Sequence, residues 1–395
     1  MERKTIGCAP AVDLRRPTAP VCTIAAVAVA LLIATTGCRG TRHGQVLTID
    51  VPAPALQGSV FPNGARQPCL VYLPPSYEGT TGRYPVLYYL PGFTTSVDEY
   101  TDGSFDGFEL GESMDLLIGS GVIREMIVVI PNGRNFLGGS FFANSPVTGD
   151  WEDFITKDVV RFIDENYRSL GRPEARAISG ESMGGFGALT IAMKHSSIFR
   201  QVYALSPGIF APGGLSECGM STPDRIEARL TWQAMLDQLP QEEALARFRQ
   251  HVADLYATGR RFPYHWAFGY AYGAAFAPDP QGKVPFSRFP WVRNGDRVQV
   301  DHEAYQLFEN GFGGWEAKVA EHAASLKALD GIVIDYGRND RLEWIPRGCV
   351  HLSEVMQAAG IPHELRAHDG GHIDRWRERM ETQALPFVSD RFNSH

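Results

Sequence analysis

Hydrophobic residues are gathered into short runs separated by longer segments of mixed polarity. The runs 84–90 and 126–130 are almost entirely apolar, which is typical of strands buried on both faces of a sheet. Each is followed by a proline, Pro91 or Pro131, where the strand is expected to stop. The same pattern predicts further strands at 45–56, 68–73, 176–179, 201–205, 331–336 and 362–367.

Between these runs the apolar residues recur with helical spacing. In 151–167 they recur every three to four residues, as in a helix packed on a sheet. Further helices are expected at 109–119, 184–195, 348–359 and 374–383. The alternation of buried strands and amphipathic helices predicts an α/β fold, with a mostly parallel sheet covered on both faces. Ligands of such sheets bind beyond the carboxyl ends of the strands.

The alternation lapses between Pro207 and about Leu326, where the pattern predicts no clean strand. The segments 225–258 and 316–326 look helical, and 262–289 is rich in aromatic residues, proline and glycine. We expect this stretch, 207–326, to be a cap inserted over the carboxyl edge of the sheet. Its aromatic residues either line an acyl or aryl pocket or form the core of the cap itself: Tyr264, Trp266, Phe268, Tyr270, Tyr272 and Phe276.

Composition fits a globular protein, and the charge balance narrows the partners. Hydrophobic residues make up 44% of the chain, charged residues 21%, and the net charge is −8. Residues 1–37 are net positive, so the remainder is more acidic than the whole. Because there is no cluster of lysine and arginine, we expect no nucleic-acid partner.

The N-terminus has the features of an export signal. Four basic residues precede an apolar run from Val21 to Ile33, which is followed by small residues and Cys38. The run is shorter than the roughly 20 residues that a spanning helix needs. Gly37-Cys38 resembles a bacterial lipoprotein signal, in which the cysteine is lipidated. We expect a signal peptide at 1–37, a lipid anchor at Cys38 as the only membrane contact, and an exported domain at 38–395 carrying the cap.

Three cysteines remain after Cys38, namely Cys69, Cys218 and Cys349. The sequence leaves open whether two of them form a disulfide or all three are buried and unpaired. None has the spacing of metal ligands, so no metal site is expected.

The segment 175–188 contains Gly180-Glu181-Ser182-Met183-Gly184, which has the form G-x-S-x-G. A serine on a sharp strand-to-helix turn leaves no room for side chains two residues before or after it, so Gly180 and Gly184 fit a nucleophile elbow. The turn would present the Ser182 hydroxyl near a helix N-terminus, where backbone N–H groups stabilise a developing oxyanion.

A nucleophilic serine needs a base and a carboxylate that orients the base. His372 lies in a Gly-Gly-His loop after the last predicted strand, and Asp340 lies in the loop after the strand 331–336. The order serine, acid, histidine, each after a strand, is that of α/β-hydrolases. Asp335, Glu343 and Asp369 are alternative acids with less suitable positions. The oxyanion hole is expected to combine the backbone N–H groups of Met183 and Phe93.

These segments resemble the esterase-D type of α/β-hydrolase, whose relatives include S-formylglutathione hydrolases, feruloyl esterases and mycolyltransferases. The resemblance runs from about Leu70 to Arg377 and is weakest in the cap. It implies Ser182 as nucleophile, Asp340 as acid, His372 as base, and oxyanion donors at Phe93 and Met183. Many members have His-Gly where this chain has Pro91-Gly92. The matching segments are 71–77, 84–92, 144–149, 151–154, 180–188, 337–340 and 370–372.

We therefore expect a serine carboxylesterase that forms an acyl-enzyme on Ser182 and needs no cofactor. Its substrate would be a small-molecule or glycan-linked ester. An acyltransferase with the same triad is the alternative, because the cap that selects the acceptor cannot be interpreted from sequence. A non-catalytic binding protein of the same fold is the third hypothesis.

Overall fold

The computed structural model describes residues 43–257 and 264–392. The expected signal peptide and the lipid anchor at Cys38 lie outside these residues. Among the described residues, no helix is both long and apolar enough to cross a bilayer.

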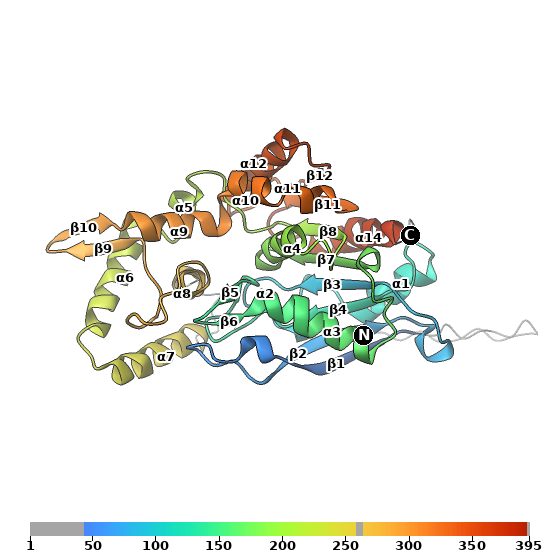
Figure 1. Cartoon of the computed structure of the whole chain (residues 1–395), viewed down its shortest axis with the longest axis horizontal. Helices are drawn as coiled ribbons and strands as arrows, with labels where there is room; N and C mark the ends of the chain where they lie inside the picture. Colours follow the sequence, from blue (N-terminus) through green and yellow to red (C-terminus); the bar gives the residue numbers. More distant parts are fainter. Residues whose placement is uncertain (1–42, 258–263, 393–395) are drawn as a thin grey trace, which may run out of the picture. The chain divides into compact units, whose positions relative to one another are not determined.

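An eight-stranded sheet forms the centre of the described chain (Figure 1). Its order is β1-β2-β4-β3-β7-β8-β11-β12, with β1 and β2 antiparallel to their neighbours and the other strands parallel. The predicted α/β-hydrolase architecture is therefore confirmed. The strands are β1 (Gln45–Pro52), β2 (Arg66–Leu73), β3 (Val86–Leu90), β4 (Ile127–Pro131), β7 (Arg176–Glu181), β8 (Gln201–Leu205), β11 (Gly331–Gly337) and β12 (Glu364–His368).

Side chains of the central strands alternate between two hydrophobic clusters, one on each face of the sheet. In β3, Val86, Tyr88 and Leu90 belong to the larger cluster, whereas Leu87 and Tyr89 belong to the smaller one. Both sets are buried, which explains why β3 is apolar throughout.

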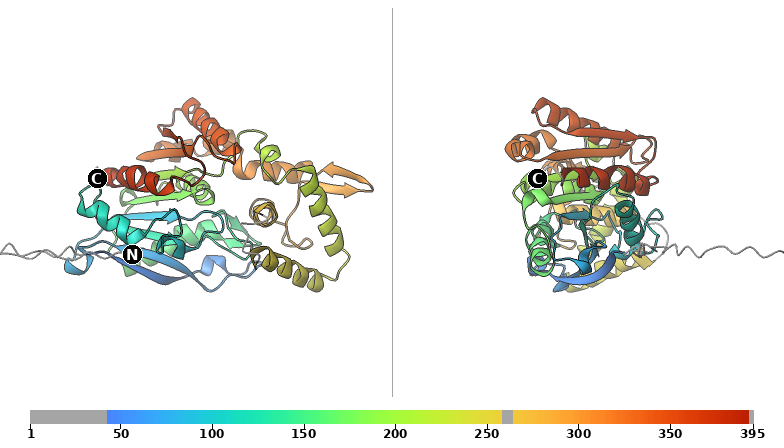
Figure 2. Two further views of the ribbon diagram at one scale, coloured as in Figure 1. Left: turned by 180° about the vertical axis from the view of Figure 1, so that it is seen from behind. Right: turned by 90° about the vertical axis from the view of Figure 1, so that its right-hand side faces the viewer.

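Helices cover both faces (Figure 2). The larger cluster takes residues from α3 (Val160–Asn166), α4 (Met183–Lys194) and α12 (Trp344–Ala358). The smaller one takes residues from α1 (Leu110–Gly119), α13 (Trp376–Arg379) and α14 (Leu385–Arg391). The helix expected at 151–167 comprises α2 (Trp151–Asp153), a π-helical segment (Phe154–Val159) and α3.

The segment between β8 and β11 is an insertion made mainly of helices, beyond the carboxyl ends of the parallel strands (Figure 1). The predicted absence of strands here is wrong, because β9 and β10 form a hairpin. The aromatic stretch also contains a helix, α8. The elements are α5 (Gly214–Glu217), α6 (Pro223–Leu236), α7 (Gln241–Ala257), α8 (Tyr264–Phe276), β9 (Trp291–Asn294), β10 (Arg297–Val300), α9 (His302–Phe312), α10 (Trp315–Glu321) and α11 (Ala323–Lys327).

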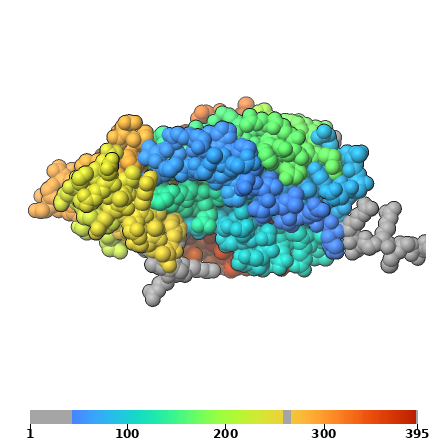
Figure 3. Space-filling view, turned by 90° about the horizontal axis from the view of Figure 1, so that it is seen from below, coloured from blue at the N-terminus to red at the C-terminus, as the bar shows by residue number. Residues whose placement is uncertain are grey.

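Local sequence explains where the helices of the insertion begin. Pro223 occupies the first turn of α6, where its missing N–H costs no hydrogen bond. The Asp301 side chain accepts from the Ala304 N–H and caps α9. Figure 3 shows α7 beside the segment that follows β1. Beneath this contact the buried rings of Phe248 and Phe61 lie 5.8 Å apart.

Candidate active site

Ser182 lies on a sharp turn between β7 and α4. Its backbone has φ 54° and ψ −114°, a conformation that costs a side-chain-bearing residue about 1–3 kcal/mol. Backbone hydrogen bonds hold the turn: the Ser182 N–H donates to the Leu205 carbonyl at 2.9 Å, and the Ser182 carbonyl accepts from Gly208 N–H at 3.0 Å. Neighbouring β8 and its following loop thus fix the serine at the carboxyl end of β7.

Close backbone contacts explain the two glycines of the motif. A Cβ at Gly184 would lie 1.8 Å from the Leu90 carbonyl oxygen, and one at Gly180 would lie 2.5 Å from the same oxygen. Both distances are far inside van der Waals contact. The end of β3 therefore packs directly on the turn that carries Ser182.

The three side chains of the predicted triad form one hydrogen-bonded line. His372 Nε2 is 3.0 Å from Ser182 Oγ, and His372 Nδ1 is 2.6 Å from Asp340 Oδ2. The Asp340 side chain is fully buried and its other oxygen accepts from the Leu342 N–H at 2.8 Å. Since Nδ1 donates to this carboxylate, Nε2 is left as the acceptor that faces the serine hydroxyl.

The loops of Asp340 and His372 are joined through their backbones. The Asn339 N–H donates to the Gly370 carbonyl at 3.0 Å, and the Asn339 side chain donates to the Asp369 carbonyl at 2.7 Å. A Cβ on Gly337 would lie 2.2 Å from the Gly371 carbonyl oxygen. The backbones of the two loops are therefore too close for a side chain to fit between them. This contact sets the separation of the acid and the histidine.

The alternative acids have other partners or positions. Asp335 Oδ2 accepts from Arg379 at 2.6 Å and from the Tyr203 hydroxyl at 2.5 Å. Asp369 is exposed and pairs with Arg338. Glu343 is exposed and lies directly before α12.

Glu181 joins the turn of Ser182 to the loop after β3. Its carboxylate accepts from the Gly92 N–H at 2.6 Å, from the Tyr100 hydroxyl at 2.8 Å and from the Tyr89 hydroxyl. Burial raises the pKa of Glu181 to about 7. This role of Glu181 was not predicted from the sequence. A signal was present, because a carboxylate next to a wholly buried strand needs partners.

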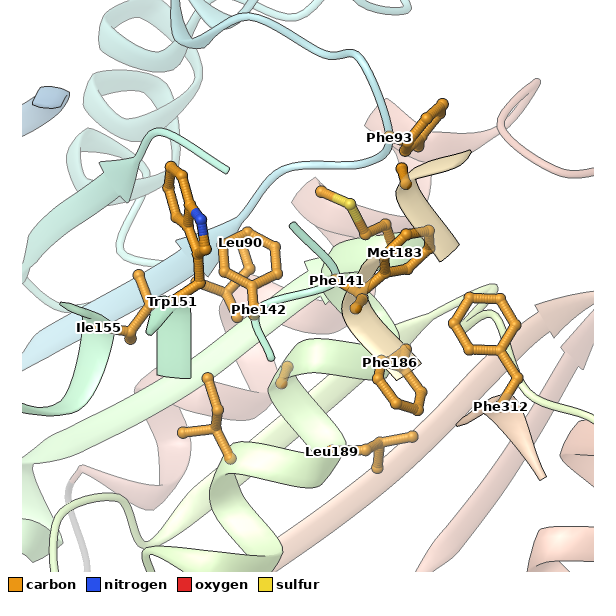
Figure 4. Packing of buried hydrophobic residues seen from close by; sticks show 14 of the residues in the cluster. Leu90, Phe93, Phe141, Phe142, Trp151, Ile155, Met183, Phe186, Leu189 and Phe312 are labelled. Carbon is orange, nitrogen blue, oxygen red and sulfur yellow. The ribbon is translucent and has the colours of Figure 1, made fainter. Parts of the chain in front are cut away.

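The bond from Gly92 also bears on the oxyanion hole. The Gly92 N–H donates to Glu181 and is therefore not available to an oxyanion. The next N–H along this loop is that of Phe93. The N–H of Met183 begins α4 on the other side of Ser182. Figure 4 shows the Phe93 and Met183 side chains close to Phe141. Both expected donors thus belong to the segments that Glu181 connects.

Gly138 and Gly139, which were not predicted to matter, lie against the residues of the expected oxyanion donors. A Cβ on Gly139 would lie 2.3 Å from the Phe93 ring and 2.6 Å from Met183 Sδ. The Thr94 N–H donates to the Gly138 carbonyl at 3.0 Å. The loop that follows β4 therefore packs against both Phe93 and Met183, whose N–H groups are the expected oxyanion donors.

The aromatic residues of α8 belong mainly to a packed core. Phe268, Tyr270 and Tyr272 are buried, and the Phe268 ring centroid is 5.2 Å from that of Phe93. Of the two interpretations, the structure favours a core of the cap, with Phe268 also covering the loop of Phe93.

No metal centre or disulfide is found in the described part of the chain. No three histidine, cysteine or carboxylate side chains gather there as metal ligands. Cys69, Cys218 and Cys349 are buried and unpaired, and burial raises the pKa of each thiol. These thiols are therefore poor nucleophiles and poor metal ligands.

Two kinds of relative share this chain's sequence over part of its length. An esterase of Mycobacterium tuberculosis is 33% identical over 134 residues, which cover 33% of this chain and 26% of the relative. S-formylglutathione hydrolase of Arabidopsis thaliana is 28% identical over 151 residues, which cover 35% of this chain and 50% of the relative. The matched regions thus span at most half of these curated relatives.

Solved structures share the fold over most of the chain. A ferulic acid esterase superposes with a TM-score of 0.56 and 22% identity, covering 88% of this chain and 99% of its own. An S-formylglutathione hydrolase from Agrobacterium tumefaciens gives a TM-score of 0.53 and 17% identity, covering 89% and 96%. At such identities the likeness concerns the fold.

The family comparison covers five of the eight strands of the sheet, the Ser182 turn and part of the insertion: β2, β3, β4, β7 and β8. Residues 64–261, which are 198 of the 395 residues, match the family described as "Putative esterase". The match includes Ser182, Gly92 and Glu181, and it ends before Asp340 and His372. By its sequence and its α/β-hydrolase fold, the chain belongs to this esterase family.

Proposed function

We propose that this protein is a serine carboxylesterase that forms an acyl-enzyme on Ser182. The observation that carries the proposal is the hydrogen-bonded line from Ser182 Oγ through His372 to the buried carboxylate of Asp340. Its position at the carboxyl ends of parallel strands is where ligands bind in such folds.

In the proposed reaction, His372 Nε2 takes the hydroxyl proton as Ser182 Oγ attacks the ester carbonyl carbon. Asp340 holds the histidine ring and stabilises the imidazolium that forms. The N–H groups of Met183 and Phe93 would donate to the oxyanion, next to the positive end of the α4 dipole. His372 then protonates the departing alkoxide, and water, activated by the same histidine, releases the acid.

The test is the substitution Ser182→Ala, assayed with p-nitrophenyl acetate. We expect kcat to fall at least about 10³-fold, because the hydroxyl is the nucleophile and the other groups act through it. Ser216→Ala, at an exposed serine of the insertion, is the matched control and should keep full activity. A fluorophosphonate probe should label the wild type and the control, but not Ser182→Ala. Retained turnover or labelling in that variant would refute the proposal.

The substrate is proposed to be a small-molecule or glycan-linked ester. The Phe93 ring, on the loop that follows β3, is stacked on Phe141 and covered by Phe268, which supports an acyl site bounded by aromatic side chains. A panel of p-nitrophenyl esters of increasing chain length, together with methyl ferulate, would define the acyl group.

We also propose that the protein is exported, through the signal at 1–37, and held at the cell envelope by a lipid on Cys38. The support is the sequence pattern: basic residues, an apolar run too short to span a bilayer, and Gly37-Cys38.

A further inference from the structure

The insertion contains a buried arginine without an acceptor. Arg229 of α6 is 6% exposed, and no hydrogen bond or ion pair joins its guanidinium to any described residue. Its Nε is fully buried and unpaired. The charge lies between two rings, 3.8 Å from the centroid of Tyr270 and 5.0 Å from that of Phe289.

Such an arrangement is costly unless something binds there. Buried arginines are normally paired with a carboxylate, because a guanidinium loses its hydration on burial. Ring contacts offset part of this cost but accept none of the five N–H donors in the usual hydrogen-bonding geometry. Burial lowers the pKa of Arg229, yet a guanidinium keeps its charge near neutral pH. The Nε–H therefore lacks an acceptor among the described residues, whereas the two amino groups of the guanidinium are not fully buried and remain accessible to a ligand.

A small cavity adjoins this guanidinium. Its volume is about 20 Å³, enough for one small group. A second guanidinium, that of Arg225, lies on the same cavity and donates to the Gly219 carbonyl. Gly269 leaves one wall bare, since a Cβ there would be 3.8 Å from Met220 Sδ. The lining residues are Met220, Arg225, Arg229, Trp266, Gly269 and Phe289.

The surroundings of the cavity offer donors and rings. The Tyr270 hydroxyl, His251 Nε2 and Trp232 Nε1 are buried without partners. The His251 ring lies 4.4 Å from Trp232 and 5.5 Å from Trp266, and its pKa is lowered by burial and by the charge of Arg229. None of the lining residues is acidic, so the cavity is positively charged.

We propose that this cavity in the insertion binds the carboxylate group of an organic acid, held by Arg229 and assisted by Arg225. The planar fork of a guanidinium matches a carboxylate in a bidentate pair. Trp266 and Phe289 offer apolar surface to the remainder of such an acid. The site is separate from the triad and does not depend on esterase activity, since it involves neither Ser182 nor His372.

The test is a titration of the intact protein with sodium phenylacetate at constant ionic strength, with sodium chloride as the reference. Trp266 and Trp232 report binding through their fluorescence. We expect a saturable change in the wild type and at least tenfold weaker binding in Arg229→Met. In Gly269→Ala the added methyl meets only ordinary contacts but occupies the cavity, so binding should weaken at least tenfold although the guanidinium remains. Arg249→Met, at an exposed arginine of α7, should bind as the wild type does.

Several results would overturn the proposal. Equal responses in the wild type and Arg229→Met, or a linear response shared with chloride, would show that no site exists. If Arg229→Met does not fold, as judged by circular dichroism, Gly269→Ala decides, and unchanged binding in that variant refutes the cavity as the site. Inorganic phosphate that binds tenfold more tightly than phenylacetate would refute the assignment to carboxylates.

Discussion

At the scale of single residues, the site depends on two buried carboxylates, those of Asp340 and Glu181, which are both hydrogen-bonded. Asp340 uses one carboxylate oxygen for His372 and the other for the backbone of its own loop. Ser182 and His372 could be predicted from the sequence, because their types and loops are distinctive. For Glu181 the sequence indicated a need for partners but not which ones, because Tyr89 and Tyr100 are 92 and 81 positions away along the chain.

Asp340→Asn should lower kcat toward p-nitrophenyl acetate by about 10³- to 10⁴-fold with little change in the fold. The amide keeps the size of the carboxylate but can donate to His372, which favours the wrong tautomer and removes the charge that stabilises the imidazolium. Asp369→Asn, at the exposed partner of Arg338, is the matched control and should remain nearly as active as the wild type. Comparable losses in the two variants would exclude Asp340 as the acid.

Glu181→Gln should change how stability depends on pH. Burial raises the pKa of this carboxyl from 4.5 to about 7, so between these values the unfolded chain has lost the proton that the folded protein retains. The free energy of unfolding therefore falls as pH rises through this window, by up to about 3 kcal/mol, and levels off above about pH 7. The glutamine does not titrate, so the variant should lack this fall.

The measurement is urea unfolding at a series of pH values from 4.5 to 8, for the wild type, Glu181→Gln and the exposed control Glu242→Gln. The difference between the wild type and Glu181→Gln should shift in favour of the variant as pH rises. A difference that stays constant with pH would mean that the pKa of Glu181 is not raised in the folded protein.

At the scale of elements, a strand or helix could be predicted when its burial leaves a clear hydrophobic pattern in the sequence. β3 and β4 are buried on both faces and give unbroken apolar runs, so they were located to within two residues. The helix α8 was missed because it is apolar around its whole circumference and has no amphipathic period. The exposed hairpin β9–β10 was missed because each strand has only four residues and seven of these eight residues are exposed, so no buried apolar run marks it.

The loop after β4 gives a test of the oxyanion hole that leaves the triad intact. In Gly139→Ala the new Cβ would collide with the Phe93 ring and with Met183 Sδ, so these side chains or the Gly139 loop must shift, and we expect the shift to displace at least one backbone donor. Loss of a single oxyanion donor costs about 10²- to 10³-fold in kcat, and we expect a loss of that order here with little change in KM. Fluorophosphonate labelling should slow but persist.

The control for this variant is Gly119→Ala at the end of α1, where the added methyl meets nothing within 4 Å. It should be as active as the wild type and at least as stable, because alanine favours a helix more than glycine does. Full activity in Gly139→Ala would show that Phe93 and Met183 do not provide the oxyanion hole.

At the scale of the whole molecule, the order of the residues along the chain was enough to predict how they meet. Parallel strands bring their carboxyl ends to one edge, so Ser182 after β7, Asp340 after β11 and His372 after β12 reach the same place. The insertion is different, because its helices pack by side-chain shape and not by a repeated pairing rule. Its internal packing, including the cavity at Arg229, therefore required the structure.

Export can be tested on the full-length chain in a bacterial host that processes lipoproteins. If Cys38 carries the lipid, the wild type should fractionate with membranes and incorporate labelled palmitate, and Cys38→Ser should do neither. The esterase activity of Cys38→Ser should be unchanged, because the described domain begins after this residue and Ser182, Asp340 and His372 lie far along the chain from it. Cys22→Ser, within the apolar run, is the control for the loss of a thiol.

Palmitate incorporation in Cys38→Ser would refute the anchor. Retention of an uncleaved chain in the cytoplasm by the wild type would refute export itself.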